Sequence, residues 1–215
     1  MERRLFLRDM AIGAGLSVYA GFSSHGWAED ALAEVVLKGF PVRKQETPYT
    51  CGPASVRMVL EFLGHKILEE EIAERMGTSK QFGTSHGRLK RAYNKYLNEL
   101  ETGLLAKTVR GKDVYVNLVA DSLDMGLPVI ASFLTENHFN PGTAVGHFCV
   151  IIGVNLKTRL FFMANPFGYR EEVDIDLFWR LARWNPGKGD IPGVPYKKTP
   201  RLRLPRTLVV LEKKS

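Results

Sequence analysis

The fold is decided by one stretch of the sequence, Cys51-Gly52-Pro53-Ala54-Ser55-Val56-Arg57-Met58-Val59-Leu60-Glu61-Phe62-Leu63-Gly64. Its apolar residues at positions 56, 59, 60 and 63 recur at the spacing that places side chains on one face of a helix. Proline in the first turn and glycine after the last turn are typical of helix ends. We therefore expect a helix that begins at Cys51 and packs one face into a core.

The sequence on either side predicts further helices and then strands. Helical spacing recurs over residues 68–76, 88–97 and 113–125, and again over 176–184. Short runs rich in Val, Ile and Phe predict strands over residues 128–133, 146–154, 160–164 and 207–211, with an edge strand over 35–42 that Pro41 breaks. Because most helices precede the strands, we expect an α+β domain in which an N-terminal helical half packs on a C-terminal antiparallel sheet.

Composition limits the class of protein. A chain of 215 residues with 45% apolar side chains can bury one good core, which favours a single domain. An aromatic share of 10% excludes an intrinsically disordered chain. Two cysteines, Cys51 and Cys149, exclude a disulfide scaffold and an all-cysteine metal site. The histidines lack ligand spacing, and neither the glutamate pair Glu171-Glu172 nor the run Glu69-Glu70-Glu71 lies with them, so we expect no metal and no other cofactor.

Residues 1–28 have the parts of a bacterial export signal. The paired arginines Arg3 and Arg4 precede Leu-Phe-Leu-Arg, a mildly apolar run over residues 10–22 and small residues before Glu29. This order resembles the twin-arginine signal. The apolar run is shorter than the roughly 20 residues that a membrane span needs. We expect cleavage after Ala28 and a protein that works in the periplasm or outside the cell, with an uncleaved anchor as the alternative.

The net charge of +7 is concentrated at the two ends of the chain. Residues 1–28 hold three basic and two acidic groups, and residues 186–215 hold eight basic and two acidic groups, so these segments carry +1 and +6. The body over residues 29–185 is therefore neutral, which argues against nucleic-acid binding. We expect a solvated basic, proline-rich tail over 186–215 that ends in a strand, with contact to an acidic surface as the alternative.

Cys51 is the candidate nucleophile. At the start of a helix a sulfur faces unpaired backbone N–H groups and the positive end of the helix dipole, which favour the thiolate. Gln45 lies six residues upstream, where its amide can donate to an oxyanion that develops beside Cys51. The alternatives are a small buried core residue for Cys51 and a solvated loop residue for Gln45.

A base for Cys51 must come from elsewhere in the chain, and the candidates are His25, His65, His86, His138 and His147. His25 leaves with the signal, His65 follows a helix end, and His86 and His138 lie in polar loops. His147 is the one ionisable group at the head of an apolar strand, where it must be hydrogen-bonded or functional. We expect it to pair with Cys51, the alternative being a satisfied core histidine.

The second nitrogen of a basic imidazole needs a partner that orients the ring. Asn165 closes the strand that follows, at the end that a tight hairpin brings near His147. Asn165-Pro166 is also a common way to begin a turn, and the two roles are compatible.

These motifs together resemble the papain-like bacteriocin-processing peptidases, which cut leader peptides after a double glycine. The resemblance covers residues 41–185 and rests on Gln45-x5-Cys51-Gly52-Pro53-Ala54-Ser55, Gly83-Thr84-Ser85, Gly126-Leu127-Pro128, Gly146-His147-Phe148 and Asn165-Pro166-Phe167-Gly168. It implies a papain-like fold over 29–185, a peptide or small amide substrate, and four site residues: Cys51 as nucleophile, His147 as base, Asn165 as orienting residue and Gln45 as oxyanion donor.

The chain departs from that family's pattern in three ways. The family commonly has aspartate at the position of Asn165, although papain also has asparagine. No transporter segments follow the domain, and the export signal places it across the membrane from the usual leader-cleaving domain. The resemblance is therefore a better guide to the peptidase chemistry of this chain than to its substrate.

Two other functions stay open from the sequence. One is γ-glutamyl peptide transfer or hydrolysis, as in phytochelatin-synthase-like proteins. The other is a peptide-binding module that keeps the fold without turnover.

Cys149 lies two residues after His147, on the same face of the predicted strand. In an oxidising compartment it can form a disulfide that silences Cys51, the alternative being a buried core cysteine. The sequence leaves the oligomeric state unknown.

Overall fold

The computed structural model describes residues 34–110, 115–136, 144–182 and 207–214. Several predictions lie outside these residues: the export signal with its cut site, His25, His138, the first residues of the helix expected from 113, and most of the basic tail. Among the described residues, no helix combines the length and apolar character that a membrane crossing requires.

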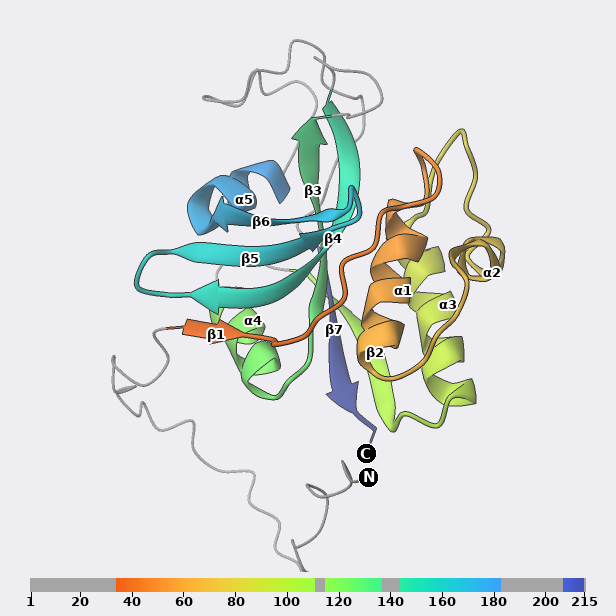
Figure 1. The fold of residues 1–215 in the computed structure, drawn as a ribbon, viewed down its shortest axis with the longest axis horizontal. Helices are drawn as coiled ribbons and strands as arrows, with labels where there is room; N and C mark the ends of the chain where they lie inside the picture. Colours follow the sequence, from red (N-terminus) through yellow and green to blue (C-terminus); the bar gives the residue numbers. More distant parts are fainter. Residues whose placement is uncertain (1–33, 111–114, 137–143, 183–206, 215) are drawn as a thin grey trace, which may run out of the picture. The chain divides into compact units, whose positions relative to one another are not determined.

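A seven-stranded antiparallel sheet forms the centre of the described structure (Figure 1). Its strands run in the order β2-β7-β3-β4-β5-β6, and β1 pairs with one end of β4. They are β1 (Glu34–Val36), β2 (Leu104–Val109), β3 (Val129–Glu136), β4 (Ala144–Asn155), β5 (Leu160–Asn165), β6 (Tyr169–Asp174) and β7 (Leu208–Lys213). β4 is the longest strand, and it pairs with β3, β5 and β1.

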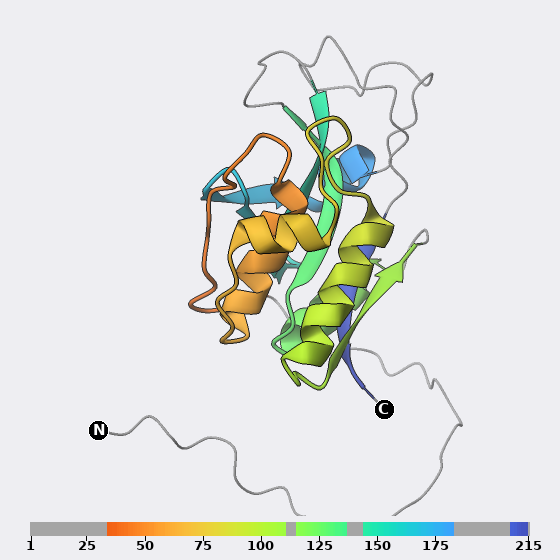
Figure 2. The same cartoon turned by 90° about the vertical axis from the view of Figure 1, so that its right-hand side faces the viewer.

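Five helices in the described residues surround the sheet: α1 (Cys51–Phe62), α2 (Glu69–Arg75), α3 (His86–Glu99), α4 (Tyr115–Asp124) and α5 (Ile175–Ala182). α1 packs on β4 and α3 on β2, while α5 contacts β3 and α4 contacts β4. Figure 2 shows α2 and α3 beside α1, with β2 along α3. The α+β class, with helices on an antiparallel sheet, is confirmed.

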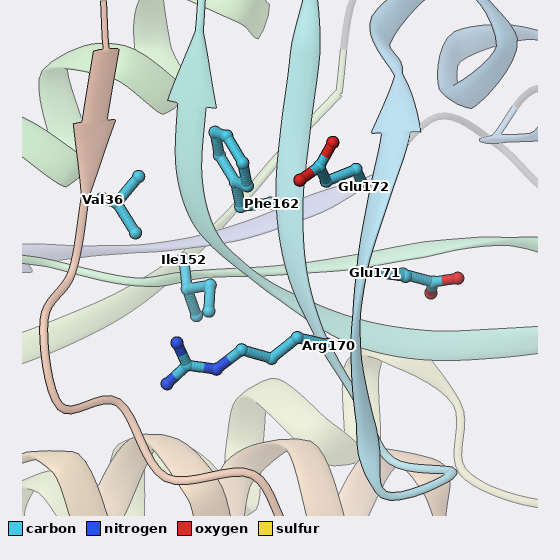
Figure 3. A pocket seen from close by; sticks show the side chains of 6 residues that line it. All are labelled: Val36, Ile152, Phe162, Arg170, Glu171 and Glu172. Atoms are coloured by element: carbon cyan, nitrogen blue, oxygen red, sulfur yellow. The ribbon is translucent and has the colours of Figure 1, made fainter.

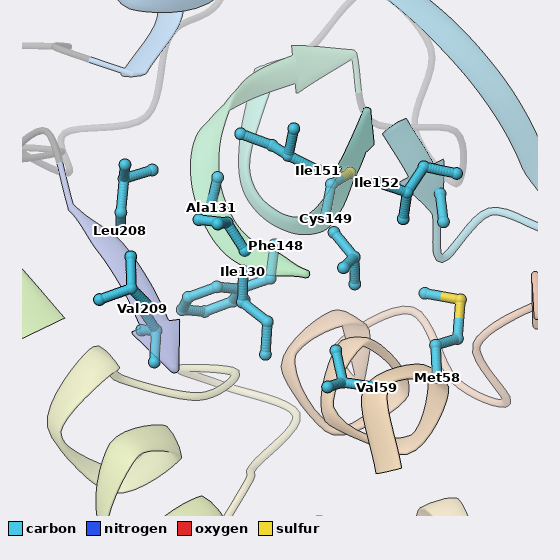
Figure 4. Packing of buried hydrophobic residues seen from close by; sticks show 14 of the residues in the cluster. Met58, Val59, Ile130, Ala131, Phe148, Cys149, Ile151, Ile152, Leu208 and Val209 are labelled. Atoms are coloured by element: carbon cyan, nitrogen blue, oxygen red, sulfur yellow. The ribbon is translucent and has the colours of Figure 1, made fainter. Parts of the chain in front are cut away.

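The helix that begins at Cys51 packs as its sequence predicts. Val56, Val59 and Leu60 are fully buried, and Leu63 lies partly buried against the core. Figure 4 shows Val59 and Met58 of this helix facing residues of the sheet that include Phe148 and Cys149. Each fully buried aliphatic side chain contributes about 1.5–3 kcal/mol to folding. This burial fixes the start of α1, with Cys51, against β4.

Two strands were not expected from the sequence, and both lie at edges of the sheet. β6 (Tyr169–Asp174) carries four charged residues and has no apolar run, because one side faces solvent. β2 (Leu104–Val109) follows α3 directly and precedes α4, so helices and strands interleave more than expected. The first predicted strand is also shorter than expected: of residues 35–42 only Val35 and Val36 pair with β4, together with Glu34 before them.

Candidate active site

Cys51 is the first residue of α1 and remains partly exposed. Burial of the sulfur raises the pKa of the Cys51 thiol, although hydrogen bonds from the backbone N–H groups of Phe148, Gly52 and Cys51 itself act in the opposite direction. The negative charge of Glu69 raises this pKa further. The backbone N–H groups at the helix start thus favour the thiolate, as expected, but burial outweighs them. A neighbouring base must take the proton before the sulfur can attack.

The hydrogen bond from Phe148 places Cys51 beside β4, at the residue that follows His147. Gly52 makes this approach possible, because a Cβ at that position would lie 3.1 Å from Cβ of Thr84 and 3.4 Å from Cδ2 of Phe148. The backbone at Gly52 is therefore packed closely against the side chains of Thr84 and Phe148.

His147 is 3% exposed and is held on two sides. Its Nε2 lies 3.0 Å from Oδ1 of Asn165. The ring of Phe167 stacks on the imidazole with centroids 4.2 Å apart, and Phe133 meets it edge-on at 6.3 Å. These contacts fix the orientation of the imidazole.

The contacts of Asn165 also determine which His147 nitrogen carries the proton. Oδ1 of Asn165 accepts a hydrogen bond from the backbone N–H of Phe167 at 2.9 Å, and Nδ2 donates to Oε1 of Glu171 at 2.6 Å. A backbone N–H only donates and a carboxylate only accepts, so the amide cannot be flipped. Nε2 of His147 must therefore be the donor to Oδ1. In the neutral ring this leaves Nδ1 as the basic nitrogen.

Gln45 lies on the segment that leads into α1 and is 5% exposed. Its Nε2 donates to the backbone carbonyl of Thr47 at 2.6 Å, and Oε1 has no partner among the described residues. Its backbone N–H donates to the carbonyl of Pro166 at 2.6 Å, directly after Asn165. Hydrogen bonds thus bring the four predicted site residues into one neighbourhood. Cys51 is bonded to Phe148, which follows His147. His147 is bonded to Asn165, and Gln45 is bonded to Pro166, which follows Asn165.

Sequence reasoning missed two carboxylates in this neighbourhood. Glu171 was noted only as part of an acidic pair, because β6 was not predicted and nothing placed that pair beside Asn165. Glu69 opens α2, is 1% exposed, and accepts a hydrogen bond from the backbone N–H of Glu46 at 2.8 Å. No pattern in Glu69-Glu70-Glu71 distinguishes the buried member from its exposed neighbours.

The other described histidines have different surroundings. Nε2 of His86 lies 2.7 Å from Oγ of Ser132, and the His86 ring packs against Phe148 at 4.9 Å. Burial, with the nearby charge of Arg110, lowers the pKa of His86 to about 4. The backbone N–H of His65 donates to the carbonyl of Leu60 at 2.8 Å, which closes the end of α1 as expected.

Cys149 is fully buried, and both cysteines are free thiols. The structure thus agrees with the core-cysteine reading and contains no Cys51–Cys149 disulfide. Burial raises the pKa of Cys149 strongly, and the charge of Glu171 adds to this rise. In the described part of the chain, no three His, Cys, Asp or Glu side chains are grouped as a metal site would need.

A pocket of about 390 Å³ lies over β1, β4, β5 and β6. Val36, Ile152 and Phe162 supply its apolar part (Figure 3). Arg170, Glu171 and Glu172 of β6 complete its lining. In Figure 3 the side chains of Arg170 and Glu172 extend from one side of β6 and that of Glu171 from the other, as the alternation of a strand requires. Glu171 is thereby directed toward Asn165.

Comparison with known proteins gives a consistent result. Residues 37–189 match the Peptidase_C39 like family. None of the functionally curated proteins matches the chain.

Three solved structures share the fold at low sequence identity. A protein described as a C39-like peptidase from Bacillus anthracis is 15% identical, with a TM-score of 0.57 over 85% of this chain and 98% of that one. The peptidase domain of Streptococcus ComA, a bi-functional ABC transporter of a quorum-sensing pathway, is 14% identical, with a TM-score of 0.52 over 81% and 99%. A double glycine motif protease from an AMS/PCAT transporter, in complex with its leader peptide, is 19% identical, with a TM-score of 0.52 over 84% and 99%.

Proposed function

Because the chain belongs to the C39-like peptidase family, we propose that it is a cysteine peptidase that hydrolyses a peptide or amide bond, with Cys51 as nucleophile and His147 as base. One observation carries the proposal: the amide of Asn165 requires Nε2 of His147 to be a donor, which makes Nδ1 the basic nitrogen of a buried, stacked ring beside the start of α1.

Acylation begins with a proton transfer. Nδ1 of His147 takes the thiol proton of Cys51, and the sulfur attacks the carbonyl carbon of the scissile bond. The carbonyl π electrons move to oxygen, which becomes an oxyanion. Nδ1–H of the imidazolium then protonates the leaving amine, and the C–N bond breaks to leave a thioester on Cys51.

Deacylation repeats these steps with water. Neutral His147 removes a proton from water, the resulting hydroxide attacks the thioester, and the sulfur leaves as the thiolate that recovers the proton. During acylation and deacylation the Nε2–H group of His147 stays hydrogen-bonded to Oδ1 of Asn165, so the ring does not rotate while its charge changes.

Gln45 and the start of α1 are suited to hold the oxyanion. One hydrogen of Gln45 Nε2 is committed to the carbonyl of Thr47, which fixes the amide and leaves its second hydrogen as a donor. The backbone N–H of Cys51 is the second donor. Removal of one such donor costs about 10²–10³ in kcat in enzymes that use this device.

We propose a peptide as the substrate, in keeping with the leader peptide bound by one structural neighbour. We also propose that residues 1–28 direct the protein out of the cytoplasm, so that this peptide is met in the periplasm or outside the cell.

Digestion of a peptide library tests the function. The purified wild-type chain should release fragments, and Cys51→Ala and His147→Ala should release none. Cys149→Ser is the matched control, because it also removes a thiol, and we expect it to retain cleavage. Undiminished hydrolysis by Cys51→Ala would refute the proposal. Binding of peptides without cleavage by the wild type would favour a binding module, and glycine release from glutathione would favour γ-glutamyl chemistry.

A further inference from the structure

A hydrogen-bonded chain of three side chains runs from the imidazole of His147 to a carboxylate. Nε2 of His147 donates to Asn165 at 3.0 Å, and Asn165 in turn donates to Glu171 at 2.6 Å. Asn165 is fully buried, so the charge of Glu171 reaches the ring through protein and not through bulk water.

The strand register explains why these side chains meet. β5 and β6 form an antiparallel hairpin in which Asn165 pairs with Tyr169 and Met163 pairs with Glu171. Asn165 and Glu171 are therefore diagonal neighbours on one face of the hairpin. The pocket residues Arg170 and Glu172 extend from the opposite face of β6.

We propose that Glu171 is a positioning residue that supplies, through Asn165, the negative charge that balances a protonated His147. This inference rests on the proposed function and names the source of charge for its base. An amide at position 165 orients the ring, but it has no charge of its own with which to stabilise the imidazolium. The carboxylate of Glu171, one hydrogen bond further from the ring, provides that charge. It does so without an anion at position 165, which would lie closer to the Cys51 sulfur.

The other described groups near His147 do not supply this charge. The thiols of Cys51 and Cys149 are neutral near pH 7, because burial raises both pKa values. His86 lies against Phe148 and is neutral, since its pKa is about 4. The charge of Glu69 raises the pKa of Cys51, and Glu69 also forms an ion pair with Arg57, in which Nη1 of Arg57 lies 3.6 Å from Oε2 of Glu69.

The remaining neighbouring charges are cationic or paired at the surface. Lys44 lies against Gly168, in the turn after Asn165. On α5, Asp176 is exposed and pairs with Arg159. In the described part of the chain, Glu171 is thus the carboxylate that hydrogen bonds connect to His147, and the raised pKa of Cys51 makes a strong base necessary.

Exchanging the amide and the carboxylate tests the proposal. Glu171→Gln removes the charge but keeps an oxygen that accepts from Asn165. Asn165→Asp combined with Glu171→Gln restores one carboxylate, with the hydrogen bond between the two side chains reversed. Glu172→Gln is the matched control, because it removes the same charge from the adjacent residue on the opposite face of β6.

Two readouts separate charge from structure. The first is the pKa of the His147 ring, measured by NMR titration in a Cys51→Ala background in which no thiolate interferes and no turnover occurs. We expect Glu171→Gln to lower this pKa by about one pH unit, Glu172→Gln to leave it unchanged and the double exchange to restore it. The second is kcat/KM for peptide cleavage with Cys51 intact, which should fall on the order of 10-fold in Glu171→Gln, mainly through kcat, and recover in the double exchange.

Equal His147 pKa values in Glu171→Gln and Glu172→Gln would overturn the proposal, even if cleavage fell, since the role of Glu171 would then be structural. A lower pKa that the double exchange does not restore would also overturn it. If Cys51→Ala still hydrolyses peptides, the proposed function fails instead, and the NMR result is unaffected because it does not require turnover.

Discussion

The backbone N–H of Gln45 donates to the carbonyl oxygen of Pro166 at 2.6 Å. Lys44 forms a backbone bridge with Phe167 at the same place. The segment that leads into α1 and the turn that follows Asn165 are thus joined directly, although more than a hundred residues separate them. The position of Gln45, the proposed oxyanion donor, is therefore set by the turn that follows Asn165, the hydrogen-bond partner of His147.

Substitution of Gly168 tests the connection between this turn and the segment that holds Gln45. Its φ is +99°, and an added Cβ would lie 3.1 Å from Cβ of Lys44. Gly168→Ala should therefore push the Lys44-Gln45 segment away from the turn, reduce kcat/KM for peptide cleavage at least 10-fold, and lower the free energy of unfolding by about 1–3 kcal/mol.

Gly126→Ala is the matched control for Gly168→Ala. Gly126 also has a positive φ, +76°, but no atom lies within 4 Å of an added Cβ. We expect a stability loss of about 1 kcal/mol from backbone strain alone, with kcat/KM unchanged. Equal kinetic effects of the two substitutions would show that the turn does not position Gln45.

Glu69 should lower the reactivity of Cys51. Its negative charge raises the pKa of the thiol, so Glu69→Gln should lower that pKa and increase the iodoacetamide alkylation rate of Cys51 at pH 7.5 by about twofold. Glu70→Gln, an exposed neighbour on α2, should leave the rate unchanged. Mass spectrometry of the labelled peptide distinguishes Cys51 from Cys149. An unchanged rate in Glu69→Gln would contradict the prediction.

His86 should make the fold sensitive to mild acid. Its pKa is about 4 in the folded protein and 6.5 ordinarily, so only the unfolded chain binds the proton between these values. The contribution of His86 to stability is therefore present above pH 6.5 and is lost as the pH falls toward 4, by up to about 3 kcal/mol.

Urea unfolding at pH 7.5 and pH 4.5 measures this loss. His86→Gln, which can still bond to Ser132, should lose less stability between the two pH values than the wild type. His65→Gln at the end of α1 is the control and should behave as the wild type. If the free energy of unfolding depended on pH identically in the wild type and in His86→Gln, His86 would not be the source of the acid sensitivity.

The helix that begins at Cys51 and the core strands could be predicted because their sequences satisfy local rules. The buried positions 56, 59 and 60 repeat at helical spacing, and the interior of β4 is an apolar run. His147 stood out for the same reason, as a polar residue in an apolar strand. These features need no knowledge of the partner segments.

The supporting residues could not be predicted, because their roles depend on pairing. Glu171 lies on a polar edge strand, and only the register of β5 with β6 brings it to Asn165. Glu69 resembles its two exposed neighbours in sequence, and only the folded chain brings it to the backbone N–H of Glu46. The thiol pKa of Cys51 was misjudged because burial, which follows from tertiary packing, outweighs the local effect of the helix start.

Edge strand β2, which the sequence did not predict, is attached to α3 through Asn94. The side-chain amide of Asn94 on α3 makes two hydrogen bonds to the backbone of Ala106 in β2. Its Oδ1 accepts from the N–H of Ala106 at 2.6 Å, and its Nδ2 donates to the carbonyl of Ala106 at 3.0 Å. Ala106 is 2% exposed, so both backbone groups would be left without a partner in Asn94→Ala. An unsatisfied buried polar group costs about 1–3 kcal/mol.

Asn94→Ala should therefore lower the free energy of unfolding by about 2–4 kcal/mol, as measured by urea denaturation. Asn98→Ala, one turn later on α3, is the control, because the Asn98 side chain is exposed and, among the described side chains, accepts a hydrogen bond from Nζ of Lys214 at the surface. We expect that control to change stability by less than about 0.5 kcal/mol. Equal losses in the two variants would show that helix propensity alone, and not the hold of Asn94 on β2, sets the cost.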